Sequence, residues 1–417
     1  MAVAIIAGKR TAFTKMGTAL RHASAIDLGV SPVNALVSQF NLQTNPHGLL
    51  TFGSTLHHAD VSNLSREIAL ESHLHPQTRA FSCVMACATS LLTVHQASQW
   101  IKNGLVPWAI AGGCDSTSDI PISFNKRVSQ ILGDLNAAKT TFNKIKHIAR
   151  LRPSDWVPKI PAVAERSTGL SMGRHCEKMM ADWKIPREEQ DAWAVMSQKR
   201  AAQSQDFYQP FLCQTRHAEQ ASKDNLIRPD TSLEKIARLP PVFDKQGTLT
   251  AANSSPMTDG GAAVLLADKD YAQKQGWPIL AWIDDVELAA IDIYKEGLLM
   301  APSYAILRLL KRQKQNLTDF DIIEIHEAFA AQVLANLKAL KDERWAQQQA
   351  GCPPTLVPTY DRINPHGGSI ALGHPFGATG ARLVMQLAQE LFDAQAKQGL
   401  ISVCAAGGLG MVMSLRR

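Results

Sequence analysis

The chain has 417 residues, of which 45% are apolar, and a formal net charge of +6. That length and apolar content suffice for a large core in two or three domains and exclude a disordered protein. A transmembrane helix is also excluded, because no run approaches the roughly 18 consecutive apolar residues that span a bilayer. The opening run from Met1 to Gly8 is too short for a signal peptide, and its charges, Lys9 and Arg10, follow it. We therefore expect an intracellular protein.

Short apolar runs alternate with helical stretches over the first 119 residues. Strands that alternate with helices indicate an α/β fold. We assign residues 1–119 to the first part of an N-terminal half. The expected strands are 1–7, 49–52 and 106–111, and the expected helices are 24–39, 63–72 and 88–103.

The alternation stops between about 120 and 239, and we predict an inserted domain over 120–246 with one clear helix at 187–203. Its early part is basic, with eight Lys and Arg against two Asp between Lys126 and Lys159. Such a segment attracts phosphates, anionic lipid headgroups or nucleic acid, or it is a solvated face without a ligand. Loosely periodic apolar residues within it predict an amphipathic helix. They are Ile131, Leu135, Phe142, Ile145 and Ile148.

Regular alternation resumes at Gly247, so that 247–277 completes the N-terminal half and 278–417 forms a C-terminal half. The last strands are expected at 400–404 and 411–415, joined by a glycine-rich turn. The segment Ile110-Ala-Gly-Gly resembles Cys404-Ala-Ala-Gly-Gly. Two similar halves would place an active site where they meet.

The seven cysteines are odd in number and lack a CxxC pair, so we expect neither a disulfide framework nor a metal site. Cys87 precedes a run with helical periodicity, which places its sulfur at a helix N-terminus. The helix dipole and free backbone N–H groups there favour a thiolate and can bind an oxyanion. A buried cysteine at a helix start is also common as simple packing, so the local pattern leaves both interpretations open.

The loop 364–380 holds five glycines and two histidines ahead of a helix. So many glycines indicate tight turns and close backbone approach. His374, between Gly373 and Pro375, is a candidate base for a thiol.

Two further segments end strands with reactive side chains. Cys404 closes a buried strand on a glycine turn and is a second acid/base candidate. The segment from Ile322 to Ala330 begins as a strand and becomes a helix, which would deliver His326 and Glu327 to a strand end, where α/β sites form.

Five motifs, four of them around the residues described above, occur in the order of the thiolase family, and the resemblance runs from about residue 5 to 413. It implies an α/β fold with a duplicated five-layered αβαβα architecture and an inserted loop domain, residues 120–246, that covers the nucleotide of coenzyme A. The motifs are Cys87-Ala-Thr-Ser, Thr250-Ala-Ala-Asn-Ser-Ser with Asp259-Gly260, His326-Glu-Ala-Phe, Gly373-His-Pro-Phe-Gly-Ala-Thr-Gly and Cys404-Ala-Ala-Gly-Gly-Leu-Gly.

The resemblance also implies a role for each catalytic residue. Cys87 takes the acyl group, His374 activates it, and Cys404 moves the proton of coenzyme A (CoA) or acetyl-CoA. The backbone N–H groups of Cys87 and Ala406 form one oxyanion hole. His374 and a water held by His326 form the other.

Two positions depart from most thiolases. His326 stands where most have Asn, and this version resembles the thiolase subunit of fatty-acid oxidation trifunctional complexes. Pro256 replaces a common glycine beside the pantetheine channel and puts the loop shape in doubt. Met172, Ala251 and Ser255 are implied CoA contacts.

The implied activity is acyl transfer (class 2.3.1): thiolytic cleavage of 3-ketoacyl-CoA in fatty-acid beta-oxidation, with CoA as co-substrate and no tightly bound cofactor. The alternatives are biosynthetic condensation to acetoacetyl-CoA and a mainly complex-forming or membrane-docking subunit. Implied partners are a second copy in a homodimer, a hydratase/dehydrogenase subunit and a peripheral membrane surface, without nucleic acid. We expect a cytoplasmic location, or the mitochondrial matrix as the alternative.

Overall fold

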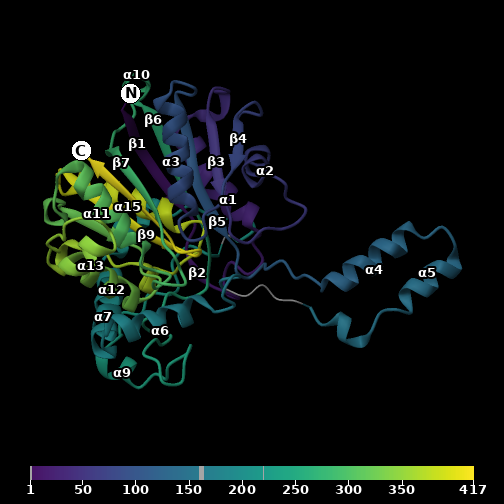
Figure 1. The fold of residues 1–417 in the computed structure, drawn as a ribbon. Coiled ribbons are helices and arrows are strands. Elements are labelled where there is room, and N and C mark those ends of the chain that lie inside the picture. Colours follow the sequence, from purple (N-terminus) through teal and green to yellow (C-terminus); the bar gives the residue numbers. More distant parts are fainter. Residues whose placement is uncertain (1, 159–163, 219) are drawn as a thin grey trace.

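The computed structural model describes residues 2–158, 164–218 and 220–417. Within these residues one mixed sheet of ten strands runs through the molecule (Figure 1), in the order β4-β3-β5-β6-β1-β7-β10-β9-β8, with β2 paired to β6. The strands are β1 Val3–Arg10, β2 Thr14–Lys15, β3 Leu49–Gly53, β4 Arg79–Ser82, β5 Trp108–Asp115, β6 Thr258–Asp268, β7 Ala281–Ala290, β8 Ile322–Ile325, β9 Gln398–Ala405 and β10 Leu409–Arg416.

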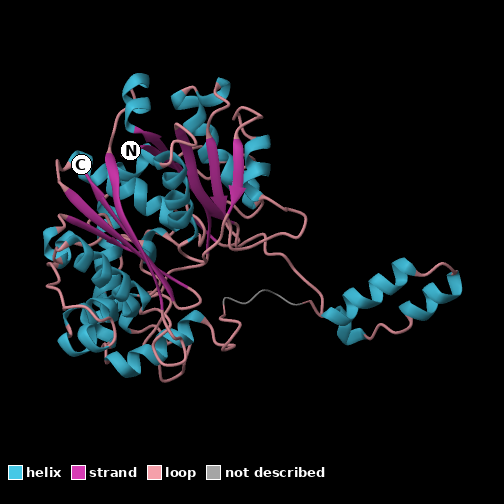
Figure 2. Ribbon diagram, turned by 45° about the horizontal axis from the view of Figure 1, so that its top comes forward, coloured by secondary structure: helices cyan, strands magenta, loops and turns pink. Residues whose placement is uncertain are grey.

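Helices cover both faces of the sheet and form most of the segment between β5 and β6 (Figure 2). The α-helices are α1 Ala25–Phe40, α2 Leu64–Glu71, α3 Thr89–Lys102, α4 Lys126–Ala137, α5 Thr141–Ile148, α6 Met172–Trp183, α7 Arg187–Gln203, α8 Gln205–Tyr208, α9 Leu233–Ala237, α10 Lys269–Gln275, α11 Ala301–Gln313, α12 Ala330–Lys341, α13 Glu343–Gln348, α14 Ser369–Leu372 and α15 Thr379–Asp393. Short 3₁₀ helices lie at Leu42–Thr44, Pro153–Trp156, Gln209–Phe211, Leu317–Asp319 and Tyr360–Arg362.

The two halves of the sheet repeat one topology. In the first half β3 is parallel to β5, and β5 and β1 are both antiparallel to β6. In the second half β8 is parallel to β9, and β9 and β7 are both antiparallel to β10. Helices α1 and α11 follow the first strand of each half, and α3 and α15 precede the equivalent strands β5 and β9. The halves join where β1 pairs with β7.

Three clusters of buried apolar side chains fill the space between the layers of helices and strands. Buried residues of α1 and α2 pack on one face of the first half-sheet, α3 and α15 lie between the half-sheets, and α11 and α12 cover the outer face of the second. The expected five-layered α/β architecture is therefore confirmed. Strand β5 is buried along its whole length, which is why it appears as a continuous apolar run in the sequence.

The ladder registers identify equivalent positions in the two halves. Gly53 at the end of β3 pairs with Gly113, two residues before Asp115. Ile325 at the end of β8 pairs with Ser402, two residues before Cys404. Asp115 and Cys404 therefore occupy equivalent places, and so do the first residues after β3 and β8, which are Ser54 and His326.

Several boundaries differ from the sequence-based prediction. The first strand runs on to Arg10, because its ladder with β6 continues to the pair of Arg10 and Ala262. Asp224 neutralises the buried Arg10 guanidinium at 2.7 Å, and Met1 lies outside the described residues. Strand β5 begins at Trp108 and continues to Asp115. The prediction of α7 is confirmed, whereas α6 was missed, although its N-cap Ser171 is a recognisable start signal.

The basic segment forms an arm of two helices, α4 and α5, that projects from the body in both views (Figures 1 and 2). The prediction of one amphipathic helix is wrong, because the helix ends at Ala137 and Thr140 caps a second one through the backbone N–H of Asn143. Lys159 lies outside the described residues. Within the described ranges, no helix combines the length and the apolar character needed to cross a membrane.

Candidate active site

Cys87 lies in the tight turn between β4 and α3. The preceding residue, Ala86, has φ +43°, in the left-handed region that side chains disfavour. Thr89 holds this turn, because its hydroxyl accepts from the backbone N–H of Met85 at 2.9 Å and donates to the carbonyl of Ala86 at 2.7 Å. The turn presents Cys87 two residues before α3 begins, at the helix N-terminus that the sequence predicts.

The expected thiolate is not the resting form of Cys87. Burial and, second, the nearby Asp115 carboxyl raise the pKa of the Cys87 thiol to about 12. The backbone N–H groups of Cys87 and Ala406 donate toward the sulfur and only partly offset this rise. At neutral pH the sulfur therefore carries its proton, so that attack on a substrate requires a base.

His374 supplies a buried imidazole from the glycine-rich loop. Gly373, with φ +98°, makes the turn that a side chain would not tolerate, and the backbone N–H of His374 donates to Thr258 Oγ1 at 3.0 Å. The ring nitrogen Nδ1 lies 2.6 Å from Thr379 Oγ1. We assign the hydrogen of the Thr379 hydroxyl to the Pro375 carbonyl at 3.1 Å, so that this oxygen accepts from Nδ1–H and Nε2 of His374 is the basic nitrogen.

Asp115 ties this loop to the first half of the molecule. Its carboxylate accepts from the backbone N–H of Gly377 at 2.6 Å and from the Ser54 hydroxyl at 2.6 Å. A Cβ at Gly377 would lie 2.8 Å from the carbonyl oxygen of Cys114, so the two backbones meet without room for a side chain. Asp115 is not among the residues predicted from the sequence, although it closely follows the Gly-Gly pair of β5.

His326 follows β8 and faces His374. Its Nδ1 lies 2.9 Å from Ser369 Oγ, and the centroids of the two imidazole rings are 4.0 Å apart. Burial, then His374 and Arg382, lower the pKa of His326 well below its ordinary value. Burial and Arg382 lower the pKa of His374 to about 3. Both rings are therefore neutral at neutral pH.

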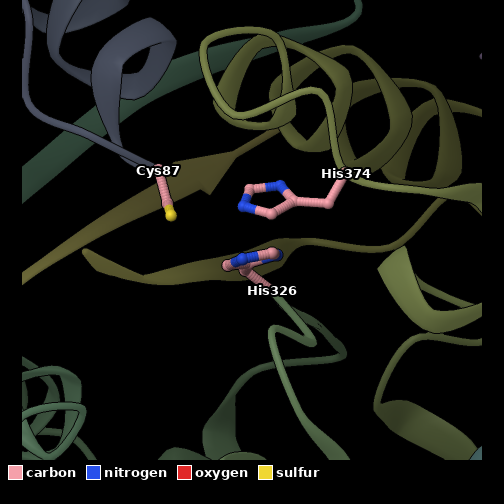
Figure 3. A group of neighbouring side chains, drawn as sticks. All are labelled: Cys87, His326 and His374. Atoms are coloured by element: carbon pink, nitrogen blue, oxygen red, sulfur yellow. The ribbon is translucent and has the colours of Figure 1, made fainter. Parts of the chain in front are cut away.

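The sulfur and the two imidazoles form one compact group (Figure 3). The Sγ atom of Cys87 and one nitrogen from each ring all lie within 4.8 Å of one another, and a nitrogen of His374 faces the sulfur. Each Nε2 is buried and has no hydrogen-bond partner in the described structure. Two unpaired buried nitrogens beside a thiol mark a place built for a polar ligand atom.

Glu327 does not share this site. Its carboxylate accepts from Trp193 Nε1 at 3.0 Å, from the Ser197 hydroxyl at 2.8 Å and from Asn364 Nδ2 at 2.8 Å. Glu327 therefore fastens α7 of the inserted segment to the glycine-rich loop, and the strand end delivers only His326 to the sulfur.

Cys404 lies at the end of β9, beside the turn that carries Ala406. Burial and, second, the neighbouring Cys87 raise the pKa of the Cys404 thiol well above its ordinary value, so it also carries its proton. The backbone N–H of Gly407 donates to the carboxylate of Glu165 at 2.8 Å, which holds the turn. The turn thus brings the Ala406 N–H to the Cys87 sulfur and places the Cys404 thiol in its neighbourhood.

The expected CoA contacts lie on two segments. Ala251 is exposed, and Ser255 is half-buried with its backbone N–H donating to the carbonyl of Ala328 at 3.0 Å. Met172 begins α6 and is half-buried. The carbonyl of Pro256 accepts from the Thr258 hydroxyl at 2.6 Å. Met257 forms an isolated β-bridge with His374, so the loop passes beside the catalytic group.

Comparisons with known proteins match this architecture. The family descriptions "Thiolase, N-terminal domain" and "Thiolase, C-terminal domain" match residues 3–270 and 277–417. The chain is 42% identical to the 3-ketoacyl-CoA thiolase of Colwellia psychrerythraea over 99% of this chain and 96% of that one, and 39% identical to that of Escherichia coli at the same coverage. The structure of a Bacillus anthracis acetyl-CoA acetyltransferase has the same fold, with a TM-score of 0.81 and 24% identity over 100% of this chain and 98% of that one. The chain therefore belongs to the thiolase family.

Proposed function

We propose that the protein is a 3-ketoacyl-CoA thiolase, an acyltransferase that cleaves 3-ketoacyl-CoA with CoA in fatty-acid beta-oxidation. The observation that carries this proposal is the group of Cys87, His326 and His374, in which the sulfur lies within 4.8 Å of a nitrogen of each ring and the Nε2 of each ring is unpaired. A second thiol, Cys404, is near enough for Cys87 to raise its pKa. The names of relatives at about 40% identity over the whole chain support it.

In the first half-reaction Cys87 passes its proton to His374 and its sulfur attacks the C3 carbonyl carbon. The N–H groups at the site stabilise the oxyanion that forms. The bond between C2 and C3 then breaks, and its electron pair remains on C2 as the enolate of acetyl-CoA. Cys404 protonates that carbon, so that acetyl-CoA leaves and Cys87 carries the shortened acyl group.

In the second half-reaction the Cys404 thiolate takes the proton of incoming CoA. The CoA sulfur attacks the acyl carbon on Cys87, and the departing Cys87 sulfur recovers its proton from His374. CoA thus acts as a co-substrate, and no step needs a metal ion or a tightly bound cofactor. Two separate half-reactions give ping-pong kinetics.

The reverse direction, condensation of two acetyl-CoA units, uses the same residues and is the second candidate function. His326 in place of the usual Asn favours degradation of longer chains. Turnover of acetoacetyl-CoA and of a long 3-ketoacyl-CoA distinguishes the two: activity confined to acetoacetyl-CoA would support the biosynthetic role.

The proposed assembly is a homodimer that binds a hydratase/dehydrogenase subunit, in the cytoplasm or alternatively in the mitochondrial matrix. The position of β4 supports the dimer: among the described strands it pairs with β3 alone, so its outer edge can add a strand, and it leads directly to the Cys87 turn. The His326-Glu-Ala-Phe motif supports the second partner. Sedimentation velocity, with and without such a subunit, tests both.

The arm supports a peripheral membrane contact. Phe142, Ile145 and Ile148 of α5 are 76%, 61% and 52% exposed, next to Lys144 and Lys146. Apolar side chains among lysines are typical of helices that lie on anionic lipid. Helix α5, which carries these residues, projects away from the body in both views (Figures 1 and 2).

Replacing the three apolar residues of α5 with serine should lower co-sedimentation with anionic phospholipid vesicles and leave thiolysis within about twofold. The variant Leu105→Ser is the matched control, because Leu105 is 55% exposed on the body. Equal sedimentation of all three proteins would remove the membrane contact from the proposal.

Mass spectrometry of the intact protein after brief exposure to a 3-ketoacyl-CoA tests the main proposal. We expect one acyl adduct on Cys87 and none in Cys87→Ala, whose turnover should fall by about 10⁴-fold or more. Cys83→Ala is the control, because that partly exposed thiol lies four residues upstream. Full turnover by Cys87→Ala would refute the assignment.

A further inference from the structure

The two neutral histidines of the site are held by different hydroxyl groups. A neutral imidazole has one N–H, so the proton on Nδ1 or Nε2 decides whether the ring donates or accepts at its other nitrogen. His326 meets Ser369 through Nδ1, and His374 meets Thr379 through Nδ1. In each ring Nε2 is the nitrogen left for the substrate. The partners of these two hydroxyls therefore determine what each ring offers.

Ser369 begins α14, and a buried arginine donates to it. Arg382 of α15 donates from one guanidinium nitrogen to Ser369 Oγ at 3.1 Å. The hydroxyl hydrogen of Ser369 then needs an acceptor, and Nδ1 of His326 at 2.9 Å is the one that the described structure provides. A hydroxyl that donates to Nδ1 leaves the ring proton on Nε2.

The Thr379 hydroxyl has the opposite role, because it accepts a hydrogen bond from its histidine instead of donating one. Its hydrogen goes to the carbonyl of Pro375, so it accepts from His374, and Nε2 of His374 is bare. The two rings, with centroids 4.0 Å apart, thus hold opposite tautomers. One presents an acceptor for the Cys87 proton and the other an N–H donor.

We propose that Ser369, oriented by Arg382, is a positioning residue that fixes His326 as an Nε2–H donor toward the substrate carbonyl or its bridging water. This inference rests on the proposed function for the identity of that carbonyl. It assigns a role to two residues that do not touch the substrate and act through His326.

The surroundings of Arg382 suit this role. Its side chain is 1% exposed, and it donates to Gln386 at 2.9 Å and lies 3.9 Å from the buried Glu324 carboxyl. Gln386 in turn donates to Glu390 at 3.2 Å. The guanidinium is therefore anchored from the side away from the site, and its positive charge opposes protonation of both histidines.

Nitrogen NMR of the full-length protein, carrying ¹⁵N-labelled histidine, tests the tautomer without any turnover. The resonances of His326 are identified among the thirteen histidines by their loss in His326→Asn. We expect the His326 proton on Nε2 in the unsubstituted protein and in Ser369→Thr, which keeps the hydroxyl. In Ser369→Ala both tautomers should be populated.

Kinetics complete the test. Ser369→Ala should lower kcat about 10- to 100-fold with KM within about threefold, because the donor acts on charge that develops in the transition state. Ser369→Thr should restore kcat to within about threefold. Ser303→Ala is the control, since it removes another buried hydroxyl that bonds Asn336 instead of His326.

A His326 proton on Nδ1, or an unchanged kcat in Ser369→Ala, would overturn the inference. Failure of the proposed function has a different signature, because Cys87→Ala would then remain active whatever tautomer the NMR spectra record.

Discussion

The two halves of this protein share one topology but equip equivalent positions differently. Ser54 and Asp115 of the first half correspond to His326 and Cys404 of the second. In the first half the pair is joined by a 2.6 Å hydrogen bond and buried. In the second half His326 has a ring nitrogen within 4.8 Å of the Cys87 sulfur, and Cys404 is near enough for Cys87 to raise its pKa. Equivalent strand ends therefore carry structural hydrogen-bonding residues in the first half and reactive residues in the second.

The helices between the sheets show the same division. Cys87 lies just before α3, and His374 lies just before the equivalent helix α15. The first half thus contributes the nucleophile, and the second contributes the base and the other proton-handling groups. Asp115 joins the two contributions, because its carboxylate bonds the Gly377 N–H of the His374 loop.

Among changes at the equivalent positions of the two halves, the largest effect is expected at Cys404, the reactive counterpart of Asp115. Cys404→Ala should lower thiolysis about 10³-fold, because the acetyl-CoA enolate then lacks its proton donor. Cys176→Ala is the matched control, since Cys176 is a buried thiol of the same apolar cluster. Steady-state thiolysis assays of both variants provide the comparison, and similar rates would mean that the second half does not supply this proton.

The next effect concerns the pH dependence of Cys87. Its pKa is raised to about 12, so the reactive thiolate should increase about tenfold per pH unit between pH 6 and 10. Alkylation by neutral iodoacetamide, measured on the Cys87 peptide by mass spectrometry, should follow that slope and rise about 100-fold from pH 7 to 9. A plateau between pH 6 and 8 would indicate a preformed thiolate with protonated His374.

A smaller loss is expected from Thr379, which orients the base. Thr379→Val removes the oxygen 2.6 Å from Nδ1 of His374 and should lower kcat about tenfold, because Nε2 no longer stays bare. Thr379→Ser should retain most of the rate. The variants are compared by kcat at saturating substrate, and a Val variant as active as the Ser variant would remove this hydroxyl from the mechanism.

The smallest catalytic effect is expected at Ser54, the structural counterpart of His326. Ser54→Ala removes a buried hydrogen bond to Asp115 and should lower the free energy of unfolding by about 1–2 kcal/mol, with kcat within about twofold. Urea unfolding and thiolysis assays measure the two quantities. A tenfold loss of kcat at unchanged stability would contradict the division between the halves.

The periodicity of the sequence and the order of its motifs predicted the fold class and the catalytic residues. Alternating apolar runs indicate the α/β class, because strand and helix burial impose different repeats along the chain. Helix α7 has the bounds that its pattern predicts. The motifs around Cys87, His326, His374 and Cys404 identify the family, since each combines a reactive side chain with its local turn.

Other features depend on contacts between distant segments. Burial opposes the thiolate that the helix start favours at Cys87. The packed layers around the sulfur raise its pKa by desolvation, and the charge of Asp115, 28 positions along the chain, raises it further. The projection of α4 and α5 from the body also depends on tertiary packing. Neither the pKa of Cys87 nor the direction of the arm can be deduced from a local sequence pattern.

The sequence by itself determined which chemical groups this protein possesses and the order in which they occur, because residue identity and local turn preference are local properties. Only the tertiary structure decided their protonation and hydrogen bonding. Burial sets the charge of Cys87, and partners such as Ser369 and Thr379 set the tautomers of two rings that lie 48 positions apart in the chain.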